Sequence, residues 1–187
     1  MDLLSITQLI IFISGTIIIV LISKKSLRNF KVHGFYRFFV FEFTFLLVIL
    51  NFPYWISRPF SPLQIFSWIF LTCSLYPLIA SVYLIKKFGN SGKRDEKSAN
   101  YNFENTTSLV TNGIYKYIRH PMYSSLLFLG LGALFKNITG ITILLALSII
   151  IFLVFTVKAE EGENINFFGQ PYKDYMKKTK MFIPYLF

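Results

Sequence analysis

The sequence has few of the residues on which disulfide-linked and metal-binding proteins rely. Among its 187 residues are one cysteine, two histidines and nine acidic residues. A single cysteine excludes an intrachain disulfide, and so few cysteines and histidines exclude a cluster of these residues around a metal. The cysteine, Cys73, lies in an apolar run, where we expect a small packing residue.

Apolar residues are what the chain has in excess. They make up 54% of it, aromatic residues make up 19%, and the mean hydropathy is +0.55. A soluble domain of this length is rarely so apolar. Abundant Phe and Tyr are typical of membrane proteins, in which aromatic residues gather at the two interfaces. The composition therefore predicts an integral membrane protein, and the length indicates one domain.

Five apolar segments predict an all-α, polytopic fold with about five transmembrane helices. The segments are 3–22, 35–52, 63–85, 122–135 and 138–157. A span needs about 20 apolar residues, so the fourth is short. It either gains length from the residues before it or forms a re-entrant pair with the fifth. We expect the last two to form a helical hairpin that turns at Lys136 and Asn137.

The basic residues predict the orientation of the chain. With the amino terminus outside and five spans, 17 of the 19 Lys and Arg lie on the inner side, and only Arg58 and Lys136 lie outside. The inner residues are Lys24, Lys25, Arg28, Lys31, Arg37, Lys86, Lys87, Lys93, Arg94, Lys97, Lys116, Arg119, Lys158, Lys173, Lys177, Lys178 and Lys180. This bias follows the positive-inside rule. The net charge of +10 therefore reflects orientation and contact with anionic lipid headgroups, and we expect no nucleic-acid partner.

The start of the chain does not indicate a cleavable signal peptide. Asp2 precedes the first apolar run, and the basic cluster follows that run. A signal peptide has the opposite order. We therefore expect the first apolar segment to be a membrane span whose amino end is outside and whose basic end is cytoplasmic.

A short polar segment lies between these spans. Residues 113–123 read GIYKYIRHPMY and are called the cassette below, and the acidic pair Glu160-Glu161 follows the apolar hairpin. The predicted orientation places both on the cytoplasmic side. Unpaired polar groups are costly in lipid, so ionisable residues at both mouths of one hairpin indicate a binding site.

The residue types of the cassette suggest what it binds. Pro121 is expected to begin the fourth helix, because its missing N–H costs nothing in a first turn. The free N–H groups of that turn, with Arg119, suit a small carboxylate or phosphate. Alternatively, Arg119 contacts lipid phosphate and His120 caps the helix. Adjacent helical residues point about 100° apart, so we expect either Glu160 or Glu161 to face the pocket and the other to pair with a lysine or meet water.

Other polar and aromatic residues are less specific. Glu42 lies within a span, five residues after Arg37, and is expected to reach the boundary or pair with Arg37, with a role at a substrate entrance as the alternative. His33 receives no role. Four aromatic residues flank a Gly-x-Pro turn in the tail, and they either anchor it at the interface or close over a flat ring. They are Phe167, Phe168, Tyr172 and Tyr175.

The carboxyl half contains several motifs of one family in the same order. They are LVTNGIYKYIRHPMY (109–123), EE (160–161), FFGQPYKDY (167–175) and a closing Phe182-Ile183-Pro184, within about residues 84–184. In these strings the chain resembles the isoprenylcysteine carboxyl methyltransferase family, within the wider group of membrane phospholipid methyltransferases. The compact five-span form and the bias toward Ile, Phe, Lys and Asn resemble short members from the prokaryotic plasma membrane.

The resemblance implies a membrane methyltransferase that uses S-adenosylmethionine. Residues 1–85 would form three membrane helices, and residues 86–187 a cofactor-binding half with the hairpin and a cytoplasmic pocket. The acceptor would be lipophilic and reach the site from the membrane, and no metal is implied. The implied cofactor-binding residues are Leu109, Val110, Tyr115, His120, Pro121, Met122, Tyr123, Glu160 and Glu161. Arg119 and Glu161 are the candidates for catalysis, and His120 or Glu161 for removing a proton.

The sequence does not identify the methyl acceptor. Eukaryotic members carry an arginine, associated with the substrate carboxylate, four residues before the first acid. This chain has Thr156 there, with Lys158 as the nearest cation. A prenylated thiol carboxylate, a phospholipid amine, a small thiol and a polyprenyl compound are all compatible with the sequence.

Two other functions are compatible with parts of the sequence. Reductases of the sterol group, which use NADPH, share an Arg-His-Pro segment. They typically continue with an asparagine, where this chain has Met122, and with a spacer and an acid, where it has Ser124-Ser125. The remaining alternative is a non-enzymatic membrane subunit.

Overall fold

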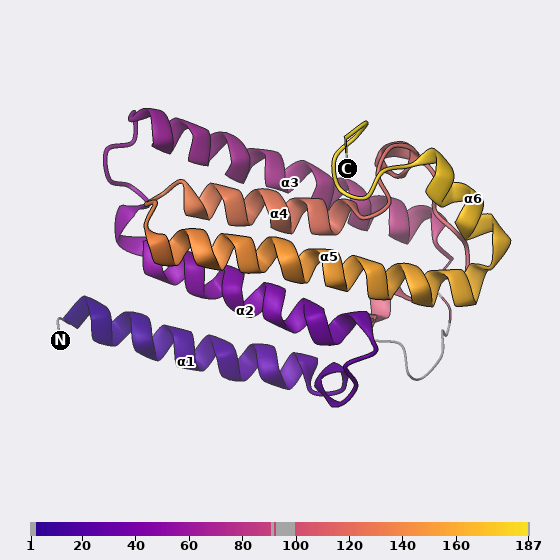
Figure 1. Ribbon diagram of the computed structural model, residues 1–187, viewed down its shortest axis with the longest axis horizontal. Coiled ribbons are helices and arrows are strands. Elements are labelled where there is room, and N and C mark those ends of the chain that lie inside the picture. The colour runs from indigo at the N-terminus through magenta and orange to yellow at the C-terminus, as the bar shows by residue number, and fades with distance from the viewer. Residues whose placement is uncertain (1–2, 91, 93–99, 187) are drawn as a thin grey trace.

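The chain folds as an all-α protein, as predicted, in a computed structural model that describes residues 3–90, 92 and 100–186 (Figure 1). The helices are α1 (Leu3–Ser23), α2 (His33–Asn51), α3 (Pro62–Phe88), α4 (Pro121–Leu134), α5 (Gly140–Phe168) and α6 (Gln170–Lys178). Short 3-10 helices are η1 (Ser26–Arg28), η2 (Phe52–Tyr54), η3 (Asn102–Glu104) and η4 (Gly113–Lys116). Lys93, Arg94 and Lys97, which the sequence places on the inner side, lie outside the described residues.

Among the described residues, four helices are long and apolar enough to cross a membrane. They comprise Ser5–Ser23, His33–Tyr54, Pro62–Phe88 and Gly140–Phe168. Helix α4 has 14 residues, roughly 21 Å at helical rise, which is less than the hydrocarbon core of about 30 Å. It begins at Pro121, as predicted, and so takes only its first three residues, 121–123, from the cassette. Helix α5 continues to Phe168, beyond the expected end at residue 157, so the acidic pair lies within a helix.

The core lies between α2, α4 and α5. In Figure 1, α1 packs along α2 at one edge, and α3 packs beside α4 at the other. The fully or nearly buried apolar side chains of this core are Val40, Leu47, Tyr123, Ala133, Leu145, Ile149, Leu153, Val157 and Phe182. Since Tyr123 and Phe182 belong to the cassette and the tail, the same core that joins the helices also fixes these two segments.

Cys73 and Lys136 differ in their exposure. Cys73 of α3, expected as a small packing residue, is exposed. Lys136, in the turn between α4 and α5, is buried. Its Nζ lies 3.5 Å from the centre of the Trp68 ring and donates to Gln64 Oε1 at 3.0 Å. Burial lowers the pKa of this ammonium group. Contact with the indole face explains how a cation is accommodated at the end of α4 far from the cassette.

Helices α3 and α4 approach closely at Gly132. A Cβ at this position would lie 2.8 Å from the Leu71 side chain and 3.0 Å from the Leu71 backbone nitrogen. Ser67 Oγ also donates to the Gly132 carbonyl at 2.7 Å. Small residues allow such contacts between membrane helices. We therefore expect Gly132→Ala to lower the free energy of unfolding by about 1–3 kcal/mol, measured by thermal unfolding in detergent.

Gly140→Ala is the matched control for this prediction. A Cβ at Gly140 would meet nothing within 4 Å, so we expect a change of less than about 0.5 kcal/mol. Equal unfolding midpoints for the two variants would contradict the proposed close contact.

Candidate functional site

The tail of the chain returns to the cassette and holds it in place. Ile118 and Lys180 form an isolated parallel β-bridge. The Arg119 N–H donates to the Lys180 carbonyl at 2.8 Å, and the His120 N–H donates to the Met181 carbonyl at 3.2 Å. One turn into α4, Ser124 Oγ donates to the Phe182 carbonyl at 2.7 Å. The backbone positions of Arg119 and His120 therefore depend on residues about 60 positions later in the chain.

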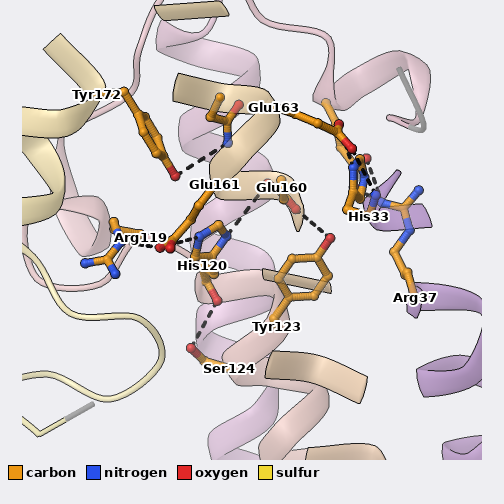
Figure 2. A network of polar contacts seen from close by, with 12 residues as sticks. His33, Arg37, Arg119, His120, Tyr123, Ser124, Glu160, Glu161, Glu163 and Tyr172 are labelled. Carbon is orange, nitrogen blue, oxygen red and sulfur yellow. Dashed lines mark hydrogen bonds and ion pairs between the residues drawn. The ribbon is translucent and has the colours of Figure 1, made fainter. Parts of the chain in front are cut away.

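The structure brings the cassette and the acidic pair together (Figure 2). Glu160 Oε2 accepts a hydrogen bond from the Tyr123 hydroxyl at 2.7 Å, and Glu161 Oε1 accepts one from Arg119 Nε at 2.7 Å. The His120 ring lies between them, with Nδ1 3.7 Å from Glu160 Oε1 and Nε2 3.4 Å from Glu161 Oε1. It also stacks on the Tyr123 ring at a centroid distance of 5.8 Å. Both ends of the apolar hairpin thus form one polar cluster.

The two acids have different surroundings. Glu160 lines the pocket described below, whereas Glu161 is 7% exposed and pairs with Arg119. The sequence predicts that one acid faces inward and that the other pairs with a lysine or meets water. The prediction for the other acid is wrong, because Glu161 pairs with an arginine. Because α5 continues through both positions, the side chains diverge by about 100°, and the cassette supplies an arginine to the outer one.

Arg119 links three parts of the site. Besides its bond to Glu161, its Nη1 donates to the Met176 carbonyl at 3.2 Å and to the Thr179 carbonyl. Its charge is thus used within the protein, and neither a lipid phosphate nor a free ligand is needed to balance it. The capping alternative for His120 is also wrong, because this N-cap residue makes no side-chain hydrogen bond to the helix start.

A pocket adjoins this cluster. It is lined by eight residues that the resemblance assigns to the cofactor: Leu109, Val110, Tyr115, His120, Pro121, Met122, Tyr123 and Glu160. The segment 100–110 forms one wall and α6 with the end of α5 forms another. The cavity has a volume of about 90 Å³, less than the roughly 300–1,000 Å³ typical of ligand sites. A ligand of adenosyl size therefore requires these walls to separate.

The tail aromatics lie mainly at this pocket. Phe168, Tyr172 and Tyr175 line it, whereas Phe167 is 44% exposed. Gly169, at φ +67°, ends α5 and begins α6, so the chain turns back over the cluster. The Tyr175 hydroxyl donates to the Tyr115 carbonyl at 2.7 Å. These positions favour contact with a flat ligand over simple anchoring at the interface.

The charged residues that line the pocket are of both signs. Glu104 and Glu160 are acidic and Arg119 is basic. Burial raises the pKa of the Tyr115, Tyr172 and Tyr175 hydroxyls, so these phenols stay neutral near pH 7. Arg119 is paired with Glu161, and Glu104 is paired with Arg37. Glu160 is therefore the carboxylate that, among neutral aromatic rings, suits a cationic ligand.

Sequence reasoning missed a second charged group, which begins on α2. Arg37 Nη1 donates to both carboxylate oxygens of Glu104, at 2.9 and 3.2 Å, and the guanidinium lies 4.2 Å from the centre of the Tyr101 ring. The predicted pairing of Glu42 with Arg37 is wrong, since Glu42 accepts a hydrogen bond from Thr16 at 3.0 Å. Five helical residues correspond to about 140° of rotation, so the two side chains diverge. The sequence did contain a signal for this group, because Arg37 is a cation next to an apolar segment.

His33 is a second residue to which the sequence gave no role. It is fully buried, and its Nδ1 lies 2.8 Å from Glu163 Oε2, while its backbone N–H donates to Glu163 Oε1 at 2.9 Å. In Figure 2, His33 and Arg37 lie on the opposite side of Glu160 from Arg119. The start of α2 is thus joined to the last turns of α5 beside the polar cluster.

Arg37 is expected to control the position of the pocket wall. Arg37→Lys keeps the charge but loses the contact with both oxygens of Glu104 and the stacking on Tyr101. We expect a loss of about 1.5–3 kcal/mol in the free energy of unfolding, and faster amide hydrogen exchange in residues 100–108. The exposed Arg58 gives the control variant Arg58→Lys. Unchanged exchange in residues 100–108 of Arg37→Lys would show that the wall does not depend on this contact.

Comparisons with known proteins match the part of the chain that contains these residues. A family model described as phospholipid methyltransferase matches residues 71–171, which include the cassette and the acidic pair. The protein-S-isoprenylcysteine O-methyltransferase of Dictyostelium discoideum is 30% identical over 156 residues, which are 76% of this chain and 61% of the relative. No solved structure gives a significant match.

Further relatives match a shorter region. The protein of the same name from Schizosaccharomyces pombe is 38% identical over 78 residues, 41% of this chain and 33% of the relative. The one from Homo sapiens is 32% identical over 84 residues, 43% of this chain and 29% of the relative. The chain thus matches less than two thirds of the length of each of these relatives.

Proposed function

Because this chain belongs to the phospholipid methyltransferase family, we propose that it is an integral-membrane methyltransferase that uses S-adenosylmethionine and a lipophilic acceptor. The observation that carries the proposal is the pocket in which Glu160, the apolar residues Leu109 and Val110, and three tail aromatics face one another. Family membership favours methyl transfer over reduction of an enone and over a non-enzymatic role.

The residues of the pocket fit the chemistry of this cofactor. S-adenosylmethionine supplies a methyl group on a positively charged sulfur. Glu160 would hold the sulfonium or ammonium group, and the Phe168 and Tyr172 rings, which are stacked on each other at 6.3 Å, would contact the base. Binding would displace the segment 100–110 or α6, because the cavity is narrow.

The chain contributes position and the exclusion of water. Methyl transfer from a sulfonium is an in-line displacement that requires no nucleophile from the protein, so holding donor and acceptor in line supplies much of the catalysis. Tyr123, fixed by Glu160 and by stacking on His120, forms a rigid wall of the pocket. For an acceptor that carries a proton, His120 is the better candidate base, since the Glu161 carboxylate is bound by Arg119. Arg119 and Glu161 are then proposed to position His120.

The acceptor is proposed to resemble prenylcysteine, with a lipid or a small thiol as the alternatives. The support is the name that the reported relatives share. Thr156 supplies no charge for an acceptor carboxylate, because it is fully buried and its hydroxyl donates to the Phe152 carbonyl at 2.7 Å. An acceptor that carries a carboxylate would therefore have to pair with a cation from another position of the chain.

We also propose an orientation and a location. The amino terminus would lie outside, and the cofactor-binding half, residues 86–187, would face the cytoplasm within a single domain in a prokaryotic plasma membrane. The support is the distribution of Lys and Arg along the chain.

Calorimetry and methyl transfer test this proposal. Purified protein in detergent is expected to bind S-adenosylhomocysteine at one site, and to transfer a tritiated methyl group to N-acetyl-farnesylcysteine or to a component of a total membrane extract. Labelled phosphatidylethanolamine or a labelled small thiol would identify the alternative acceptors. Absence of S-adenosylhomocysteine binding by folded protein would refute the proposal, and oxidation of NADPH with an enone would favour the reductase.

A further inference from the structure

A second hollow lies on the other side of the cassette from the cofactor pocket. Its volume is about 700 Å³, and α3, α4, the cassette and the closing residues 182–184 line it. Phe70 and Pro77 of α3 and Phe128 of α4 line it, and Ile114 and Ile118 of the cassette add to the apolar lining. We call this hollow the α3–α4 groove. Its volume falls within the range of ligand sites.

The groove combines an apolar lining with one cation. Lys116 is the charged residue among those that line it, and none of the lining residues is acidic. Lys116 is exposed, and within the part of the chain that the structure describes it forms no ion pair. A ligand that complements this arrangement has a long apolar chain and an anionic head.

The position of the groove in the membrane agrees with this chemistry. The groove follows α3 from Ile69, in the first third of the helix, to Pro77, and it reaches the cassette. The cassette lies against the last part of α3, since a Cβ on Gly113 would lie 2.7 Å from Leu84. Lys86 and Lys87 follow in the last turn of α3. The apolar part of the groove thus lies alongside membrane helices, and Lys116 lies at the end where basic residues gather.

We propose that the α3–α4 groove binds an anionic phospholipid, with one acyl chain between α3 and α4 and the phosphate at Lys116. Phosphate and ammonium attract each other strongly at a membrane surface. The lipid would pack against Ile114 and Ile118, whose neighbours Tyr115 and Arg119 line the cofactor pocket. The bound lipid would therefore support the cassette from the side opposite the cofactor.

Cys73 provides a direct test, because it is the single cysteine of the chain, is exposed and lines the groove. The rate of its alkylation by a maleimide is measured on the full chain in detergent with added phosphatidylglycerol or phosphatidylcholine at equal mole fraction. We expect phosphatidylglycerol to slow the reaction about fivefold more than phosphatidylcholine. Lys116→Gln should remove this difference, and Lys86→Gln, an exposed lysine at the same end of α3, should keep it. Equal protection by the two lipids, or a difference that survives in Lys116→Gln, would overturn the proposal.

Native mass spectrometry gives a second measurement that does not depend on cysteine reactivity. Cys73→Phe places a ring in the groove, so this variant should retain fewer phosphatidylglycerol molecules than the unmodified chain, and equal retention would count against the site. If N-acetyl-farnesylcysteine protects Cys73 better than phosphatidylglycerol, the groove serves the acceptor instead and the proposal fails. Neither measurement uses methyl transfer, so failure of the proposed enzymatic function would leave both results interpretable.

Discussion

Replacing Glu160 with glutamine is expected to weaken the binding of S-adenosylmethionine about a hundredfold or more. The carboxylate lies in the pocket and is fixed by the Tyr123 hydroxyl at 2.7 Å. Glutamine preserves the shape and one oxygen acceptor but removes the negative charge that would face a cationic ligand. Loss of one member of a buried charge pair costs about 3–5 kcal/mol. Isothermal titration calorimetry on the purified variant measures the change.

The comparison of two ligands separates charge from shape in this experiment. S-adenosylhomocysteine lacks the positive charge on sulfur, so we expect Glu160→Gln to weaken its binding about tenfold or less. Glu163→Gln is the control variant, because Glu163 lies one turn later on α5 and contacts His33 instead of lining the pocket. An equal loss of affinity for both ligands would show that Glu160 does not recognise the charge on sulfur.

Replacing Arg119 with glutamine is expected to destabilise the protein more than the other substitutions considered. Arg119 binds Glu161 at 2.7 Å and donates to the carbonyls of Met176 and Thr179. Its removal leaves Glu161, which is 7% exposed, without the arginine and removes two of the hydrogen bonds between the cassette and the segment that follows α5. We expect a loss of about 3–5 kcal/mol in the free energy of unfolding, measured by circular dichroism during denaturation in detergent.

A double-mutant cycle tests the assigned partner. If Arg119 acts mainly through Glu161, then Arg119→Gln combined with Glu161→Gln should cost much less than the sum of the single changes. Lys177→Gln is the control, because Lys177 forms an exposed ion pair with Asp174 and should leave stability unchanged. Additive effects in the cycle would assign the stabilisation to the two carbonyl contacts.

The sequence predicted the grouping of cassette and acids better than it predicted their partners. Two mouths of one apolar hairpin must lie on the same side of a membrane, so Arg119 and His120 could be expected near Glu160 and Glu161. The sequence predicted that the second acid pairs with a lysine or meets water. This prediction was wrong, because α6 and the tail fold back and hold Arg119 beside Glu161. The predicted pairing of Glu42 with Arg37 was also wrong. Two positions five residues apart on a helix are rotated relative to each other, so their side chains point in different directions.

The residues that the sequence missed are joined across long separations. Arg37 and Glu104 are 67 positions apart, and His33 and Glu163 are 130 positions apart. Hydrophobic periodicity and turn signals describe neighbours within about one helix length. They carry no information about which loop packs against the first turns of α2, so neither pair could be derived from the spacing.

The sequence by itself determined that this is an all-α membrane protein and where its apolar helices lie. It also determined that one of these helices begins at Pro121, within the polar cassette. Both follow from the sequence because hydropathy and proline geometry act locally. The tertiary structure alone decided which charges meet. The packing of α2 against α5 and the return of the tail to the cassette place Arg37 at Glu104 and Arg119 at Glu161. Burial then requires each carboxylate to have a partner within hydrogen-bonding distance, and only the folded chain supplies it.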